Sequence, residues 1–305
     1  MNQHRRSSCG LFVGLTTVDL VFDLQYYPTE DTKNTACAFE KAAGGPASNA
    51  AVCFAYLGGQ AHLLSMLGKS NMALIARQDL ECCGVVHSDL CNDDEFSPAI
   101  SAIVASRASA TRTICTSPAI NADVESLSVA QESFDLTQSD IILIDGHITT
   151  VARKIAREAK ESGATIVLDG DIYRPEIESL LSDIDIVIFG KSFSVPGKKS
   201  VGDAIEYFRS FGIKSIAATS GPDPIQYWHE GVMGVVEVEP VRAVDTLAAG
   251  DFFHGAFCYQ FTQSGNFIQS LKFAACVAAH SVTSFGPRMW MQRYDAEYLK
   301  RKSSP

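Results

Sequence analysis

The sequence predicts an α/β protein with a doubly wound, mostly parallel sheet and a small β-sheet lid. From residue 139 onward, short runs that are apolar throughout alternate with helical segments, which is the pattern of a parallel sheet covered on both faces. Two stretches with β-like alternation, about residues 20–41 and 99–117, stand outside that pattern. We predict a single domain over residues 1–305, with these two stretches inserted and paired as the lid.

The individual elements are predicted from apolar periodicity and from the turn residues between them. Strands of the large sheet are expected at residues 11–15, 61–67, 141–145, 165–168, 184–189 and 215–219, with a terminal hairpin at 225–228 and 232–238. Helices are expected at residues 50–57, 70–83, 149–162, 175–181, 201–211, 250–262, 267–284 and 293–300. The end of the first strand is expected to carry Asp19.

The net charge indicates which kinds of partner the protein can bind, and the cysteine content indicates its cellular compartment. The formal net charge of −10 argues against a general nucleic-acid binder, because affinity for a phosphate backbone needs clustered Lys and Arg. The nine cysteines are odd in number and form no C-x-x-C pair, which predicts a reduced, cytoplasmic protein without disulfides or a zinc site. No apolar run is long enough to span a membrane.

The stretch from Asp245 to Asp251 is a loop of small residues that opens an apolar helix. Small residues let backbone amides approach an anion, and a helix N-terminus adds a favourable field. The acid at the junction, Asp251, is suited to take a proton from a hydroxyl that attacks a phosphate, and the combination indicates phosphoryl transfer. The plainer interpretation of Asp251 is an acid in a first helical turn, worth under about 1 kcal/mol.

Other polar and glycine residues follow predicted strands or turns, where ligands of open parallel sheets bind. They are Asp19, Gly44, Gly45, Asp145, Asp169, Asp171, Lys191 and Gly221. Taken singly, each is equally well explained as a loop or capping residue. Taken together with the loop that ends at Asp251, they are better explained by one shared ligand crevice.

Two motifs carry a resemblance to a known family. The stretch DTLAAGD, from Asp245 to Asp251, resembles the D-T-x-x-A-G-D signature of the ribokinase-like (PfkB) carbohydrate kinases. The stretch GGPASN, from Gly44 to Asn49, resembles the upstream G-G-x-x-x-N element of that family, and the strand followed by Asp19 is similar to its opening. The resemblance covers nearly the whole chain, and it implies the ribokinase-like fold and an ATP-dependent sugar kinase.

The resemblance also implies roles for the matching residues. Asp251 would be the general base, which typically contributes ~10²–10⁴-fold, and the backbone amides of Ala248, Ala249 and Gly250 would bind the transferring phosphoryl group. The residues that would hold the sugar hydroxyls are Asp19, Gly44, Gly45 and Asn49. The plainer interpretations are a solvated strand end for Asp19 and a polar helix position for Asn49.

On the nucleotide side, the resemblance points to the turn after the strand at 215–219 and to the helix and loop that flank adenine. The ATP-binding residues would be Lys191, Thr219, Ser220, Gly221, Thr246, Ala275 and Gly286. Relatives bind a monovalent cation, K⁺ for example, near the backbone of Asp245 and Leu247 and the loop at 284–286. Mg²⁺ would enter with ATP, held mostly by phosphates and waters.

The chain departs from the family pattern at two places. Ala248 replaces a glycine, and its methyl group is tolerable if φ stays negative, but it could crowd the phosphate. After Phe189, relatives often carry an N-x-x-E motif whose acid organises magnesium, and this chain has Gly190 and Lys191 instead. Two carboxylates could replace that acid through water, namely Asp169 and Asp171. Lys191 is explained equally well by a phosphate contact and by an exposed loop lysine.

The identity of the sugar depends on three further residues. Lys33 and the residues around it resemble the sulfofructose kinase branch, in which a lid cation would meet an anionic sugar. The stretch TRTI around Arg112 instead resembles the lid of ketohexokinases, whose sugar is neutral. His147 stands at a strand end where an anion-binding branch would use arginine. Lys33 and Arg112 are equally well explained as solvated residues of a polar hairpin.

Together these features predict a kinase that phosphorylates a hydroxyl of a small ketose or pentose. The exposed strands of its lid are expected to form a homodimer, since unpaired strand edges invite pairing. Two alternatives stay open: a nucleoside kinase of the same fold, and a sugar-binding regulatory protein with weak or no turnover, which the missing acid after Phe189 favours. A Rossmann dehydrogenase is disfavoured because no G-x-G-x-x-G follows the first strand.

Overall fold

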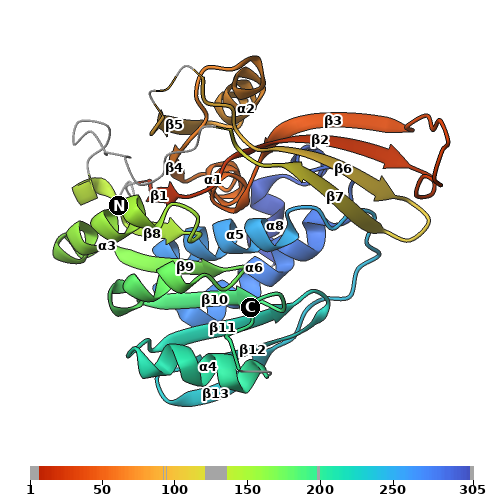
Figure 1. Ribbon diagram of the computed structural model, residues 1–305. Helices are drawn as coiled ribbons and strands as arrows, with labels where there is room; N and C mark the ends of the chain where they lie inside the picture. Colours follow the sequence, from red (N-terminus) through yellow and green to blue (C-terminus); the bar gives the residue numbers. More distant parts are fainter. Residues whose placement is uncertain (1–6, 92, 94, 121–135, 198–199, 303–305) are drawn as a thin grey trace, which may run out of the picture.

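A nine-stranded sheet forms the centre of the computed structural model, which describes residues 7–91, 93, 95–120, 136–197 and 200–302 (Figure 1). In spatial order the strands are β13 (Val232–Val236), β12 (Asp223–His229), β11 (Ser215–Ser220), β10 (Ile186–Gly190), β9 (Thr165–Gly170), β8 (Ile141–Ile144), β1 (Cys9–Val13), β4 (Gln60–Ser65) and β5 (Val85–Asp89). Neighbours from β11 to β5 pair in parallel, whereas β12 and β13 add antiparallel strands at one edge. The predicted fold class is confirmed.

Helices cover both faces of this sheet, which explains why its central strands, such as β8, β9 and β10, are almost entirely buried and mostly apolar. On one face, alternate strand residues pack in one buried cluster with α1 (Pro46–Tyr56), α5 (Ala249–Ser264) and α6 (Phe267–Ser281). On the other face, the intervening residues pack with α3 (Thr149–Ser162) and α4 (Val201–Ser210). The other helices are α2 (Asn71–Cys82), α7 (Met289–Arg293) and α8 (Ala296–Lys302). Among the described residues, no helix is both long and apolar enough to cross a bilayer.

A second sheet of four strands stands apart from the first (Figure 1). Its order is β3 (Ala38–Gly44), β2 (Thr17–Leu24), β6 (Ile100–Ser106) and β7 (Thr111–Ser117), with β2 and β6 parallel and the other pairs antiparallel. On one face, Val21 and Ile103 are buried, whereas Phe22 and Phe39 on the opposite face are 37% and 52% exposed. This sheet therefore has an inner face that packs on the protein and an outer face with exposed aromatic rings.

The structure corrects the sequence prediction at four places. Asp19 does not end the first strand, because the chain turns after Val13 and Asp19 pairs with Ala42 inside β2. The predicted helix at 175–181 is two short 3₁₀ turns, Pro175–Ser179 and Leu181–Asp183. Strand β5 has no counterpart in the prediction, since its half-exposed residues make no apolar run. The predicted helix at 293–300 is interrupted at Tyr294, whose backbone is extended.

Candidate active site

The loop before α5 is fixed by the buried carboxylate of Asp245. Asp245 Oδ1 accepts a hydrogen bond from the Leu247 amide at 3.0 Å, and Asp245 Oδ2 accepts one from the Gly286 amide at 3.0 Å. The amides of Val244 and Asp245 donate to the Val282 carbonyl at 2.7 and 3.2 Å. The predicted site residue Gly286 is therefore joined directly to the signature loop, and the start of α5 is held in one conformation.

The first turn of α5 presents unpaired backbone amides. Within the described part of the chain, the amides of Ala248, Gly250 and Asp251 have no hydrogen-bond acceptor, as expected at a helix N-terminus. The Ala249 amide makes a long contact of 3.4 Å to the Thr246 carbonyl. A Cβ placed on Gly250 would have no atom within 4 Å, so open space lies beside these amides. Free donors facing open space at a helix start are suited to bind an anion.

Ala248 does not have the negative φ that would let its methyl group fit without backbone strain. It precedes α5 with φ 60° and ψ 11°, which is the left-handed region. This conformation costs a residue with a Cβ roughly 1–2 kcal/mol, and the hydrogen bonds of the loop hold it there.

We expect Ala248→Gly to raise the free energy of unfolding by about 1 kcal/mol, because glycine enters the left-handed region without steric cost. Urea denaturation followed by circular dichroism measures this change. Ala249→Gly is the matched control, since Ala249 has a negative φ, and it should leave stability unchanged or lower it. If Ala248→Gly is no more stable than the wild type, Ala248 is not under backbone strain.

Asp251 and Asn49 lie in direct contact at the start of α5. Asn49 Nδ2 donates to Asp251 Oδ2 at 2.9 Å, which joins two residues 202 positions apart in the chain. Burial and the negative charge of Asp169 raise the pKa of Asp251 to about 7, against the opposing effect of the Asn49 hydrogen bond. A carboxyl group that titrates near neutral pH is well matched to general base catalysis.

Arg288, which was absent from the sequence prediction, orients Asn49. Arg288 NH1 donates to Asn49 Oδ1 at 3.1 Å, so the amide group of Asn49 must turn its NH₂ toward Asp251. Arg288 NH2 donates to the Ala43 carbonyl and to Asp79 Oδ2, both at 2.8 Å. The Asp79 carboxylate also accepts from the Ala43 amide at 2.9 Å. One guanidinium thus connects β3, α1 and α2 behind the catalytic candidate.

The predicted sugar-side residues Asp19, Gly44, Gly45 and Asn49 are brought together at the junction of β3 and α1. Asp19 Oδ1 accepts from Thr17 Oγ1 at 2.7 Å, and a Cβ on Gly44 would lie 2.1 Å from Asp19 Oδ2. Gly45 has φ 96°, and its Cβ would lie 2.4 Å from the Leu15 carbonyl oxygen. Burial raises the pKa of Asp19, against the effects of Thr17 and Arg288. Both glycines are therefore required for this junction.

The buried Asp145 joins the ends of three elements. Its carboxylate accepts from the amides of Leu15, Ala47 and His147 at 2.8, 3.2 and 3.0 Å. Burial alone would raise the pKa of Asp145, but the His147 ring and the backbone amides of Leu15 and His147 outweigh it and lower the pKa. The ring of His147 lies between Asp145 and Arg174, with Nδ1 3.2 Å from Asp145 Oδ1 and Nε2 2.8 Å from Arg174 NH2. His147 therefore lies at the strand end between Asp145 and an arginine that the prediction lacked.

The two acids predicted for magnesium differ in their surroundings. Asp169 is buried at the end of β9, with Oδ2 3.4 Å from His254 Nδ1 in α5, and Asp171 is exposed. Burial, Asp145 and Asp171 raise the pKa of Asp169 well above its ordinary value. His254 Nδ1 also lies 2.8 Å from the Gly250 carbonyl oxygen, so His254 links Asp169 to the first turn of α5. His254 was not predicted as a site residue.

The remaining predicted residues fall into three groups. Lys191, Thr219 and Ser220 line a cavity of about 810 Å³ between α4 and the β10–β13 edge, and Gly221 follows with φ 57°. Thr246 and Arg112 meet, since Arg112 NH1 donates to Thr246 Oγ1 at 2.5 Å and joins β7 to the signature loop. The two residues outside these contacts are Ala275, buried in α6, and Lys33, exposed between β2 and β3.

The sequence and the fold are both similar to those of known sugar kinases. Residues 11–292 match the pfkB family carbohydrate kinases. The chain is 24% identical to ribokinase of Haemophilus influenzae over 282 residues, covering 90% of this chain and 92% of that protein. It is 25% identical to ketohexokinase of Mus musculus over 291 residues, covering 88% and 94%. The solved structure of Arabidopsis thaliana ribokinase complexed with ribose and ATP has a TM-score of 0.75 at 18% identity, covering 98% of this chain and 99% of that chain. This chain belongs to the PfkB family of carbohydrate kinases.

Proposed function

We propose that this kinase transfers the γ-phosphoryl group of ATP to a hydroxyl of a small ketose or pentose. One observation carries the proposal: the Asp251 carboxyl, with a pKa of about 7, stands in the same helical turn as the unpaired amides of Ala248, Gly250 and Asp251. A base and an anion site in one turn can receive a hydroxyl proton and the charge of a transferring phosphoryl group together.

In this mechanism, the sugar lies between β3, α1 and the start of α5. Asp19 accepts and Asn49 donates hydrogen bonds to its hydroxyls, and Asp251 takes the proton of the attacking hydroxyl. The unpaired amides of Ala248, Gly250 and Asp251 stabilise the charge that develops on the phosphoryl oxygens. The contact between Arg112 and Thr246 (2.5 Å) supports a lid that places a cation beside this charge when the site closes.

The residues suited to ATP and Mg²⁺ lie at or just after the ends of β9, β10 and β11. Lys191, Thr219 and Ser220 would face the ATP phosphates. Mg²⁺ bound to ATP neutralises charge on the phosphates, and Asp169 and Asp171 offer one buried and one exposed carboxylate for contact through water. Because both carboxylate oxygens of Asp245 already accept amides, K⁺ would rely on backbone carbonyl oxygens near Leu247 and Gly286.

A substrate panel tests this function. Relatives named for ribose and for ketohexose are similar to this chain to nearly the same degree, 24% and 25%, so identity does not select the sugar. Ketoses, pentoses and nucleosides are offered with ATP and Mg²⁺, and ADP release is measured. We expect turnover with a sugar. Turnover with nucleosides alone would support the nucleoside kinase, and sugar binding without ADP release at any Mg²⁺ concentration would support a regulatory protein.

The outer face of the second sheet supports a homodimer. The rings of Phe22 and Phe39 lie 4.9 Å apart and are exposed, so pairing two such faces would remove aromatic surface from water. We expect light scattering at micromolar protein to give twice the chain mass of 32.9 kDa, and Phe39→Glu to give the monomer mass. Val86→Glu, at an exposed position of β5, is the control. A wild-type monomer would remove the proposal.

A further inference from the structure

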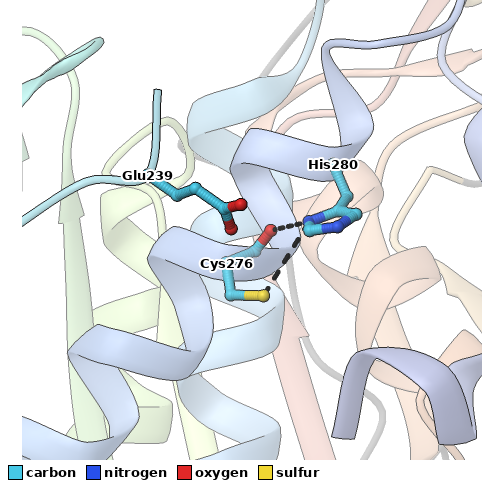
Figure 2. A group of neighbouring side chains, drawn as sticks. All are labelled: Glu239, Cys276 and His280. Atoms are coloured by element: carbon cyan, nitrogen blue, oxygen red, sulfur yellow. Dashed lines mark hydrogen bonds between the residues drawn. The ribbon is translucent and has the colours of Figure 1, made fainter. Parts of the chain in front are cut away.

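A second cluster of reactive side chains lies outside the candidate active site. Glu239, Cys276 and His280 each offer a donor atom, and these atoms all lie within 4.8 Å of one another (Figure 2). Cys276 and His280 are one turn apart on α6, so they share a face of the helix. Glu239 comes from the segment between β13 and α5. No other group of three or more such residues is this close within the described ranges of the chain.

The ring of His280 is held in an orientation that suits a metal ligand. His280 Nδ1 lies 2.7 Å from the Cys276 carbonyl oxygen and 3.8 Å from Cys276 Sγ, so Nδ1–H donates to the carbonyl and Nε2 is the ring nitrogen left to bind a metal (Figure 2). A backbone carbonyl that fixes one ring nitrogen is the usual outer partner of a metal-bound histidine. The rings of Tyr294 and Tyr298 pack edge-on against the buried imidazole, at 4.9 and 5.9 Å between centroids.

Lys302 shows that a cation is stable at this position. Its ammonium nitrogen lies 2.8 Å from Glu239 Oε1 and 3.4 Å from His280 Nε2. The Lys302 side chain is 34% exposed in the last turn of α8, so it can swing into solvent without disturbing buried groups. The cluster therefore already holds an internal cation, on a partly exposed side chain, that an ion can replace.

We propose that Glu239, Cys276 and His280 bind a divalent transition-metal ion, with Zn²⁺ as the preferred ion, in competition with the Lys302 ammonium. One sulfur, one imidazole nitrogen and one carboxylate oxygen form a donor set typical of Zn²⁺, which leaves the fourth position to water. On binding, the Cys276 thiol loses its proton to solvent and a Zn–S bond forms, with no change of oxidation state. Zn–S and Zn–N distances of about 2.3 and 2.0 Å require the donor atoms to approach by about 1 Å.

Such an ion would join α6 to the segment that leads into the signature loop. Glu239 precedes Val244 and Asp245, whose amides already donate to Val282 just beyond α6. A bound ion would connect α6 to this stretch a second time, at Glu239, which precedes Val244 in the chain. We therefore expect Zn²⁺ to raise the thermal unfolding midpoint, which is a readout independent of the kinase reaction.

Cobalt spectroscopy tests the site directly. The full chain, freed of metal with EDTA and kept reduced, is titrated with Co²⁺, whose thiolate charge-transfer and tetrahedral d–d absorption bands report Cys276 as a ligand. We expect one Co²⁺ per chain, displaced by Zn²⁺. Cys276→Ser should remove the charge-transfer band, and His280→Gln and Glu239→Gln should weaken binding. Lys302→Met should bind about fivefold more tightly, since no ion pair must be broken.

Cys82→Ser is the matched control for the other thiols, because Cys82 is exposed at the end of α2. It should keep the band, and the metal-free Cys276→Ser protein should unfold at the wild-type temperature. Failure of the wild type to bind one ion, persistence of the band in Cys276→Ser, its loss in Cys82→Ser, or a Lys302→Met protein that binds no more tightly would each overturn the proposal.

Discussion

Asp251→Asn should lower kcat by about 10²–10⁴-fold with the sugar identified by the substrate panel, because the amide cannot accept the hydroxyl proton. Asparagine keeps the shape of the side chain, so the sugar KM should change little. Steady-state ADP release measures both constants. Glu158→Gln, at an exposed position of α3, is the matched control and should leave both unchanged. An Asp251→Asn enzyme with wild-type kcat would remove Asp251 from the role of base.

The pH dependence gives a second readout of the same residue. Asp251 must be ionised to accept a proton, so wild-type kcat/KM should rise about tenfold per pH unit below pH 7 and level off above it. Because the folded-state pKa lies above the usual 3.8, the ionised carboxylate costs folding stability as pH rises from about 4 to 7, and above pH 7 the cost is complete. Asp251→Asn should therefore be more stable than the wild type at pH 8, although it is nearly inactive.

The parts of the site that follow one another in the chain were predictable from the sequence. The signature loop from Asp245 to Asp251 and the turn from Gly44 to Asn49 are runs of small residues whose chemistry is readable without a structure. Their meeting is shown by the contact between Asn49 and Asp251. The parallel sheet was predictable for a similar reason, because strands buried on both faces are apolar throughout.

The parts assembled from distant residues were not predictable. Arg288 contacts Asn49 and Asp79 across 239 and 209 positions of the chain, and nothing near it in the sequence marks it as part of a site. In the sequence, His254 is one residue of an apolar helix with nothing to mark it as part of a site. Only the fold shows that Asp169 lies beside it. The left-handed conformation of Ala248 is also hidden, because composition suggests a tight loop but does not give its dihedral angles.

Arg288→Met should lower kcat/KM by about 10–10²-fold, even though Arg288 lies behind Asn49 and is proposed as a positioning residue. Without the guanidinium, Asn49 can turn its amide group and lose the hydrogen bond to Asp251 that lowers the pKa of that carboxyl. A small misplacement of a catalytic group costs up to about 10²-fold. The pH profile of kcat/KM should shift to higher pH, which general destabilisation would not cause.

Loss of stability must be separated from this effect. Arg288→Met leaves the Asp79 carboxylate without its 2.8 Å partner, which should lower the free energy of unfolding by up to about 3 kcal/mol. Asp79→Asn in the same chain removes the unpaired charge, and its amide oxygen can still accept from the Ala43 amide. The double variant should therefore regain most of the stability.

Activity should not return with stability if Arg288 acts by orienting Asn49. The double variant should keep the low kcat/KM and the shifted pH profile of Arg288→Met, because Asn49 still lacks the donor that fixes its amide group. Urea denaturation and steady-state kinetics on the wild type, both single variants and the double variant complete the cycle. If the double variant instead recovered wild-type kcat/KM, Arg288 would act only by neutralising the charge of Asp79 and not by orienting Asn49.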